Sequence, residues 1–125
     1  MMSLNIKITA EQGASKRVSL NGRLDTITAP ELEVELDSLV AEAVQLIVFD
    51  MTDLEYISSA GLRVIFKATK SMKAKGGKTG ILKMQPQIKK VFDIVKALPD
   101  VPIFKNDEEM DEYLSHMQQQ VIDDQ

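Results

Sequence analysis

Two adjacent serines, Ser58 and Ser59, are the residues of this chain best placed to do chemistry. They follow a β-rich apolar segment, residues 44–49, and precede a segment in which Leu62 and Ile65 begin a helical spacing, so the hydrophobic period changes across them. Backbone N–H groups at a helix start favour an anion, and serine is the usual acceptor of an enzymatically transferred phosphoryl group. Serine is also a preferred helix N-cap, which leaves a purely structural role open.

Three carboxylates are candidates to surround these serines. We expect Asp25, Asp50 and Asp53 in loops at strand ends, the functional edge of an α/β sheet, although each can also cap a turn or helix. An aspartyl-phosphate receiver would use carboxylates at such a site. It requires an adjacent acid pair after the first strand, whereas the early strands here end in Thr9-Ala10 and Asn21-Gly22. We therefore rank the receiver below a serine-based function.

The remaining motifs argue against catalysis. His116 is the only histidine and cysteine is absent, so neither a metal site nor a general base for a nucleophilic serine is indicated. Gly77-Lys78-Thr79 resembles the end of a phosphate-binding P-loop, but Met72 stands where its first glycine belongs. The sequence therefore predicts a protein that is not an enzyme and needs neither a metal nor another cofactor.

Composition narrows the class of partner and the compartment. The chain has 125 residues, enough for one domain, and a formal net charge of −4, which offers no basic excess for nucleic acid. Its apolar runs are far shorter than a membrane span, and cysteine is absent. We expect a cytoplasmic protein that neither binds nucleic acid nor inserts into a membrane.

The periodicity predicts an α/β fold, a single domain with a mixed β-sheet and about four helices packed on it. We expect the domain to cover residues 4–117 and residues 118–125 to form a flexible tail. A Thr28/Glu31 pair suggests a capping box. The predicted elements are a hairpin at 4–8 and 17–21, strands at 44–50, 78–84 and 101–104, and helices at about 30–42, 60–75, 86–95 and from 106.

Two motifs resemble a known family. Asp50-Met51-Thr52-Asp53-Leu54-Glu55-Tyr56-Ile57-Ser58-Ser59-Ala60-Gly61-Leu62 is similar to the signature of STAS domains, in particular bacterial anti-sigma factor antagonists. Gly22-Arg23-Leu24-Asp25-Thr26-Ile27-Thr28-Ala29-Pro30 is similar to the second motif of that family. The resemblance covers nearly the whole chain. Two positions depart from the pattern: Ser58 stands where the family usually has Asp, and Arg23 where it usually has Glu.

The resemblance implies a partner switch. In this family the serine two positions before the glycine accepts a phosphate, and the matching residue is Ser59, with Ser58 as the alternative acceptor. The unphosphorylated protein is expected to bind an anti-sigma factor that is also a serine kinase, phosphorylation ends that binding, and a protein serine phosphatase restores it. The alternative is a non-switching STAS adaptor in a signalling scaffold or lipid transporter, in which the serine is not modified.

The partner-binding surface is expected around the serines. Besides the three aspartates and both serines, the candidate contact residues are Ile57, Gly61 and Leu62. Leu62 also fits the core face of its helix, and we favour that position for it. Gly61 is expected to allow a partner or phosphate to approach closely, because it has no side chain.

Overall fold

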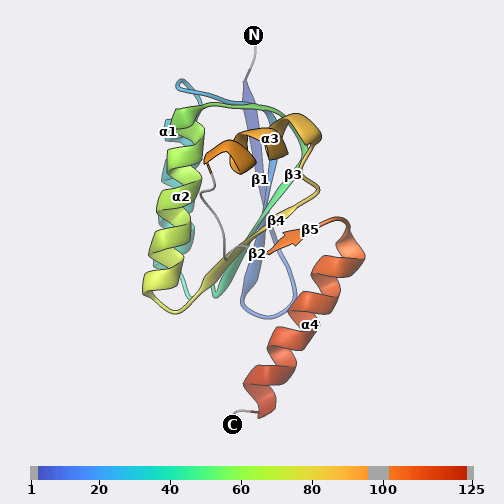
Figure 1. Cartoon of the computed structure of the whole chain (residues 1–125). Helices are drawn as coiled ribbons and strands as arrows, with labels where there is room; N and C mark the ends of the chain where they lie inside the picture. Colours follow the sequence, from blue (N-terminus) through green and yellow to red (C-terminus); the bar gives the residue numbers. More distant parts are fainter. Residues whose placement is uncertain (1–2, 96–101, 124–125) are drawn as a thin grey trace.

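The computed structural model shows one mixed five-stranded sheet with helices on both faces (Figure 1). It describes residues 3–95 and 102–123. The sheet order is β1-β2-β3-β4-β5; β1 pairs antiparallel with β2, and the remaining neighbours are parallel. The elements are β1 (Leu4–Ala10), β2 (Ser15–Leu24), α1 (Ala29–Ala41), β3 (Leu46–Ile57), α2 (Ser59–Ala74), β4 (Lys78–Leu82), α3 (Pro86–Val95), β5 (Ile103–Phe104) and α4 (Asp107–Asp123). The predicted fold class is confirmed.

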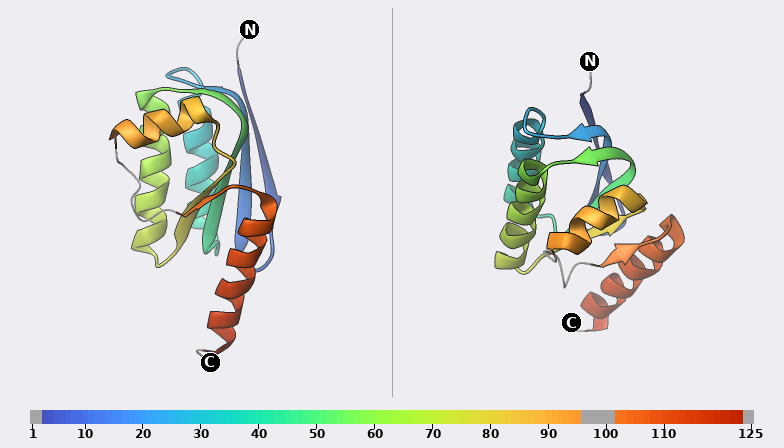
Figure 2. Two further views of the ribbon diagram at one scale, coloured as in Figure 1. Left: turned by 45° about the vertical axis from the view of Figure 1, so that its right-hand side comes forward. Right: turned by 45° about the horizontal axis from the view of Figure 1, so that its top comes forward.

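The helices divide unequally between the two faces of the sheet. Helices α1 and α2 lie side by side on one face, and α4 lies on the other (Figure 2). The larger apolar core fills the space between the sheet and α1, α2 and α3, and includes the fully buried Leu20, Phe49 and Ile65. A second, smaller core beneath α4 contains Phe104, Met110 and other buried residues. The sheet is thus covered on both sides, which explains the uninterrupted apolar run of β3 from Leu46 to Phe49.

Strand β3 is longer than its hydrophobic run predicts. The expected acidic loop after Asp50 is instead strand, because β2 continues beside it and pairs with it as far as Leu24 with Ile57. Met51, Leu54 and Ile57, buried at every third position, hold this half of β3 against the core. The spacing departs from strict alternation where the pairing with β2 has two irregularities in register.

The start of α1 also differs from expectation. Thr28 is the N-cap residue, yet its side chain makes no capping hydrogen bond, so the predicted Thr28/Glu31 capping box is wrong. Its backbone is already helical, and its hydroxyl instead donates to the Arg23 carbonyl at 2.8 Å and accepts from the Asp25 N–H at 2.9 Å. The hydroxyl therefore fastens the end of β2 to the start of α1.

The C-terminal elements agree with the prediction in order. Strand β5 is reduced to Ile103–Phe104, and Val101 of the predicted strand lies outside the described residues. Helix α4 continues as far as Asp123, through most of the segment expected to form a tail. The flexibility of that segment stays a prediction.

Candidate functional site

The two serines have different roles at the start of α2. Ser58 is the N-cap: its backbone is extended, and its Oγ accepts a hydrogen bond from the Gly61 N–H at 3.3 Å. Ser59 is the first residue of the helix and its side chain is exposed. Of the two serines, Ser58 is therefore the one that takes the N-cap role open to a serine at this position. Ser59 therefore presents a hydroxyl to solvent at the positive end of the helix dipole.

The loop after β2 reaches the same end of the sheet. The Ser58 N–H donates to the Leu24 carbonyl at 2.9 Å, which joins the serine loop to the residue before Asp25. Asp25 Oδ1 accepts from the N–H groups of Ile27 and Thr28, each at 3.0 Å. The Thr28 hydrogen bond is the main cause that lowers the pKa of Asp25 below its usual value. Asp25 therefore stays ionised and shapes the loop beside the serines.

An exposed aromatic and a cation stand next to this loop. The Arg23 guanidinium lies 4.1 Å from the ring centroid of Tyr56, its partner across β2 and β3, and its Nε is 3.9 Å from Asp25 Oδ2. Tyr56 is 40% exposed and Ile27 is 83% exposed, so both offer apolar surface. We call Arg23, Asp25, Ile27, Tyr56 and Ser59 the serine end of the molecule.

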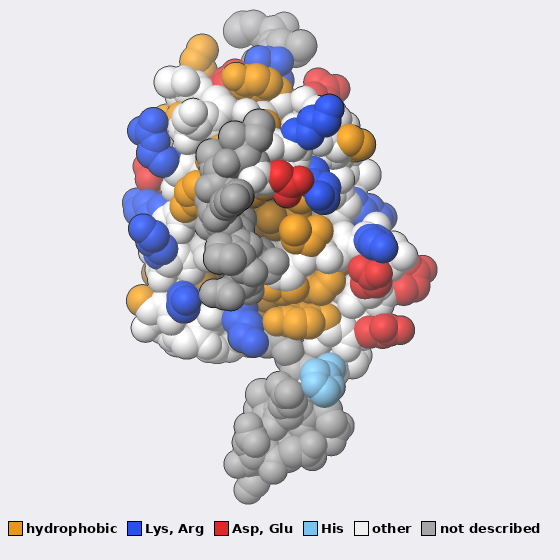
Figure 3. Space-filling view, in the orientation of Figure 1, with side chains coloured by type: hydrophobic (Ala, Val, Ile, Leu, Met, Phe, Trp, Pro, Cys, Tyr) orange, Lys and Arg blue, Asp and Glu red, His pale blue; other side chains and the backbone are white. Residues whose placement is uncertain are grey.

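A groove runs between α1 and α2 from the serine end. It has a volume of about 420 Å³, and among its lining residues are Thr26, Ala60, Arg63 and Val64. Its two walls differ in charge, because α1 has four acidic residues and no basic one, whereas α2 has four basic residues and no acidic one. Basic side chains accordingly gather over α2 in Figure 3.

One ion-pair group bridges the two walls of the groove. Lys67 Nζ lies 3.1 Å from Glu33 Oε2 and 3.5 Å from Asp37 Oδ1. The hydrogen bond to Glu33, followed by the charge of Asp37, raises the pKa of Lys67. The Lys67 ammonium is thus paired with carboxylates of α1. Arg63, one turn nearer to Ser59, is exposed and has no ion pair within the described residues.

Two of the predicted contact residues, Ile57 and Gly61, are buried instead, and Leu62 takes the core position that we favoured for it. Ile57 is 4% exposed and Leu62 is 5% exposed, and both pack in the larger core. Gly61 is buried, and a Cβ built on it would lie 2.5 Å from Leu24 Cγ and 3.0 Å from the Leu24 carbonyl oxygen. The absent side chain therefore lets α2 pack on the end of β2; it does not open a path to solvent.

Two of the three predicted aspartates lie away from the serines. Asp50 is seven positions from the end of β3 at Ile57, or about 23 Å along the strand, and Asp53 is four positions from it, or about 13 Å. Both instead line a cavity of about 340 Å³ on the sheet face away from α1 and α2, together with Asn5, Lys7, Ser19, Leu20 and Asn21. Of the three aspartates, only Asp25 lies at the serine end.

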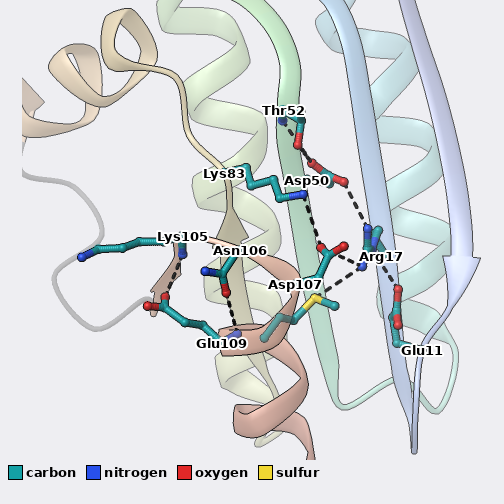
Figure 4. A network of polar contacts seen from close by, with 10 residues as sticks. Glu11, Arg17, Asp50, Thr52, Lys83, Lys105, Asn106, Asp107 and Glu109 are labelled. Atoms are coloured by element: carbon teal, nitrogen blue, oxygen red, sulfur yellow. Dashed lines mark hydrogen bonds and ion pairs between the residues drawn. The ribbon is translucent and has the colours of Figure 1, made fainter.

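Asp50 also takes part in a separate charged cluster beneath α4 (Figure 4). Arg17 contacts three carboxylates: Nε is 2.8 Å from Glu11 Oε1, NH1 is 3.3 Å from Asp50 Oδ2, and NH2 is 3.4 Å from Asp107 Oδ1. Lys83 Nζ adds a further contact to Asp107 at 3.7 Å. We call Glu11, Arg17, Asp50 and Asp107 the Arg17 cluster; it joins β2, β3 and α4.

The sequence prediction missed Ile27, Tyr56 and Arg63. A signal for Ile27 existed, because it lies between polar threonines in a turn, where an apolar side chain has no core to enter. No simple period predicts the exposure of Tyr56, because in this half of β3 the buried Leu54 and Ile57 are three residues apart and both residues between them are exposed. Arg63 lies four residues after Ser59, a spacing that places both on one helix face.

The described residues show no group of three or more His, Cys, Asp or Glu side chains that could hold a metal ion. Across the same part of the chain, none of the helices combines the length and hydropathy required to cross a membrane.

Comparisons with known proteins place these features in a family. Residues 5–110 match the model of the STAS domain. BtrV of Bordetella bronchiseptica, whose name describes it as a candidate anti-sigma factor antagonist, is 33% identical over 84 residues, which are 67% of this chain and 72% of that protein.

Solved structures share the fold. An anti-sigma factor antagonist from Mycobacterium paratuberculosis matches with a TM-score of 0.81 at 20% identity, over 90% of this chain and 95% of that one. The Bacillus protein SpoIIAA matches in its phosphorylated form with a TM-score of 0.71 at 19% identity, over 87% of this chain and 99% of that one. At these identities the structures establish the fold alone, whereas the match to the family model covers most of the sequence. The chain belongs to the STAS domain family.

Proposed function

We propose that this chain is an anti-sigma factor antagonist that binds an anti-sigma factor through the serine end, in a switch controlled by phosphorylation of Ser59. The observation that carries the proposal is that Ser58 caps α2 and Ser59 does not. Ser58 Oγ accepts the capping hydrogen bond, whereas the Ser59 hydroxyl is exposed and accessible to a kinase. BtrV is named for this function, and the STAS fold extends over nearly the whole chain.

The surface around Ser59 has the features of a partner-binding site. Ile27 and Tyr56 expose apolar area next to Arg23 and Asp25, a combination of aromatic, aliphatic and charged groups that suits a protein interface. The groove between α1 and α2 opens beside the same residues. We infer that a partner covers this end of the molecule and therefore buries Ser59.

The proposed modification transfers a phosphoryl group from ATP. The Ser59 Oγ bonds to the γ-phosphorus, the bond from that phosphorus to the β–γ bridging oxygen breaks, ADP leaves, and the hydroxyl proton passes to a base of the kinase. A phosphatase reverses the change by adding water across the new P–O bond and releasing inorganic phosphate. The chain itself acts as the substrate and binding partner in both steps and has no catalytic role of its own.

Phosphorylation would end binding by electrostatics and desolvation. The phosphate adds a charge of about −1.5 to −2 at a surface that already contains Asp25. Burying this charge beside another negative group at the interface would cost several kcal/mol of binding free energy, on the order of other like-charge contacts. Solvent and the N-terminus of α2 stabilise the same phosphate in the free protein. The switch therefore requires no unfolding.

The test is to incubate the chain and its variants with the anti-sigma factor kinases of the source organism, ATP and Mg²⁺. Modified sites are mapped by mass spectrometry, and binding is measured by calorimetry. Ser59→Ala should bind and take no phosphate, Ser59→Asp should bind at least about 30-fold more weakly, and the matched control Ser58→Ala should still be modified.

Four outcomes would contradict the proposal or one of its parts. Modification of Ser58 alone would refute the choice of residue, and tight binding by fully phosphorylated protein would refute the switch. A chain that binds a partner and is never modified would fit the adaptor role. Phosphorylation that occurs with ATP and Mg²⁺ alone, without any kinase, would contradict a non-catalytic role.

A further inference from the structure

We infer that Arg63 holds the phosphate on Ser59 and so forms the internal receptor of the modified serine. This inference rests on the proposed role of Ser59 and names the residue that stabilises the phosphorylated state. Arg63 lies one turn along α2 from Ser59, and both side chains are exposed. Side chains four residues apart in a helix are neighbours on one face.

The direction of helical side chains favours this contact. Each Cα–Cβ bond in a helix tilts toward the N-terminus, so a long side chain covers the turn that precedes it. For Arg63, that turn contains Ser59. Arg63 and Ala60 also line the same groove, which places the arginine beside the first turn of α2. A planar guanidinium can make two parallel hydrogen bonds to a phosphate.

The charges that face Ser59 single out Arg63 as the available cation. Arg23 stacks on Tyr56 and lies beside Asp25, and Lys67 is paired with Glu33 and Asp37 across the groove. Arg63 has no ion pair or hydrogen bond within the described residues. Helix α2 contains no acidic residue to repel a phosphate. On neighbouring elements, Glu33 of α1 lines the same groove as Arg63, and Asp25 follows Leu24, whose carbonyl accepts from the Ser58 N–H.

The contact gives phosphorylation a second effect on the surface. In the unmodified protein, the Arg63 guanidinium lines the groove and is available to an acidic group of a partner. Once it holds the phosphate, its charge is neutralised and it leans toward the N-terminus of α2. Phosphorylation then adds a negative charge and at the same time withdraws a positive one from the interface.

The experiment measures the pKa of the phosphate directly. Phosphoserine is inserted at position 59 during translation, which makes the test independent of any kinase, and the second ionisation is followed by ³¹P NMR. An adjacent cation favours the dianion, so the phosphate pKa in the otherwise unchanged protein should lie below its ordinary value of about 6. Arg63→Gln should raise this pKa by about 0.5, a roughly threefold change in the acid dissociation constant.

Two further variants separate a specific contact from a general charge effect. Arg63→Lys should retain part of the lowered pKa, since it keeps the charge and loses the bidentate geometry. Lys70→Gln removes a charge on the same helix, about 16 Å along the helix axis from Ser59, and should leave the phosphate pKa unchanged. An equal phosphate pKa in Arg63→Gln and the parent protein, or an equal rise in Lys70→Gln, would overturn the inference.

The kinase incubation tests the proposed function, and the phosphate pKa tests the Arg63 contact, so the two can fail independently. If kinase incubation leaves Ser59 unmodified while Arg63→Gln still raises the phosphate pKa, the proposed function fails and the geometry of the receptor stands. If Ser59 is modified and its phosphate pKa does not respond to Arg63, the receptor alone fails.

Discussion

At the Arg17 cluster, three carboxylates lie within 3.4 Å of one guanidinium, whereas at the serine end the side chains remain accessible to solvent. Both regions collect charged groups around β2 and β3. The cluster satisfies its charges internally and fastens α4 to the sheet. The serine end has exposed Ile27, Tyr56 and Ser59, and its charges are only partly paired. The difference indicates that two carboxylates predicted to surround the same serines can lie in unrelated places: Asp50 belongs to the Arg17 cluster, whereas Asp25 lies at the serine end.

This comparison predicts which substitutions change folding and which change binding alone. Residues that the motif places next to the serines but the structure buries should affect stability, and exposed residues of the serine end should affect partner binding with little effect on stability. Four substitution experiments test this division, from the largest expected effect on stability to the smallest.

The largest effect is expected at Gly61. In Gly61→Leu, the new Cβ would lie 2.5 Å from Leu24 Cγ and 3.0 Å from the Leu24 carbonyl oxygen, which is fixed by the Ser58 N–H. Overpacking against fixed backbone should destabilise the protein by about 3 kcal/mol, measured by urea denaturation. Gly76→Ala is the control: its added Cβ meets nothing within 4 Å, but its φ of +81° is unfavourable, so the cost should be only about 1 kcal/mol.

The Gly61 result would also decide between two uses of the glycine. If Gly61→Leu remains as stable as the parent protein and loses partner binding, then Gly61 belongs to the interface. In that case its burial does not indicate a structural role.

The second effect concerns the Arg17 cluster. Arg17→Met leaves the carboxylates of Glu11, Asp50 and Asp107 without their shared cation in a partly buried site. We expect a loss of about 2 kcal/mol, below the roughly 3–5 kcal/mol of a fully buried pair, because Arg17 is partly exposed. Adding Asp50→Asn should recover part of this loss. Partner binding by the folded fraction should be unchanged.

If Arg17→Met were as stable as the parent protein but bound the partner more weakly, the Arg17 cluster would belong to the partner-binding surface together with the serine end. In that case, Asp50 would return to the partner-binding residues, as the motif predicts.

The serines provide the third and smaller effect. Ser58→Ala removes the hydroxyl that caps α2 and should cost about 1 kcal/mol, seen as a lower melting temperature. Ser59→Ala removes an exposed hydroxyl and should change stability by less than about 0.5 kcal/mol. A larger loss in Ser59→Ala than in Ser58→Ala would reverse the assignment of cap and exposed hydroxyl.

The sequence predicts the order of elements and the capping of α2 well, because both depend on local patterns. The hairpin, the alternation of strands and helices and the role of Ser58 follow from period and residue type. The length of β3 could not be predicted in this way: its second half contains exposed Thr52, Asp53 and Glu55 and is strand because β2 lies beside it.

The same non-local pairing explains the errors at the site. Asp50 ends an apolar run, which in a shorter strand would place it at the sheet edge with the serines. Because β3 continues for seven more residues, Asp50 is drawn instead to Arg17, a contact between residues 33 positions apart. Gly61 and Leu24, 37 positions apart, similarly meet only in the folded chain.

The smallest effect is a pH dependence at the serine end. Hydrogen bonds from the Thr28 and Ile27 N–H groups to the Asp25 carboxylate, and the charge of Arg23, lower the pKa of Asp25 in the folded protein below its value of 3.8 in an unfolded chain. A lowered folded-state pKa means that the ionised carboxylate contributes stability above pH 3.8. That contribution decreases as the pH falls from about 3.8 through the lower folded-state pKa.

Asp25→Asn should therefore make the free energy of unfolding less dependent on pH below about pH 4. Between pH 6 and pH 8, the pH dependence should be the same in both proteins. The measurement is a series of urea denaturations from pH 2.5 to pH 8 on both proteins. The Arg17 cluster supplies the control, since Asp50→Asn removes a carboxylate that does not hold the loop before α1. If Asp50→Asn and Asp25→Asn had identical pH profiles, the acid response would not originate at the serine end, and Asp25 would not shape that loop through its charge.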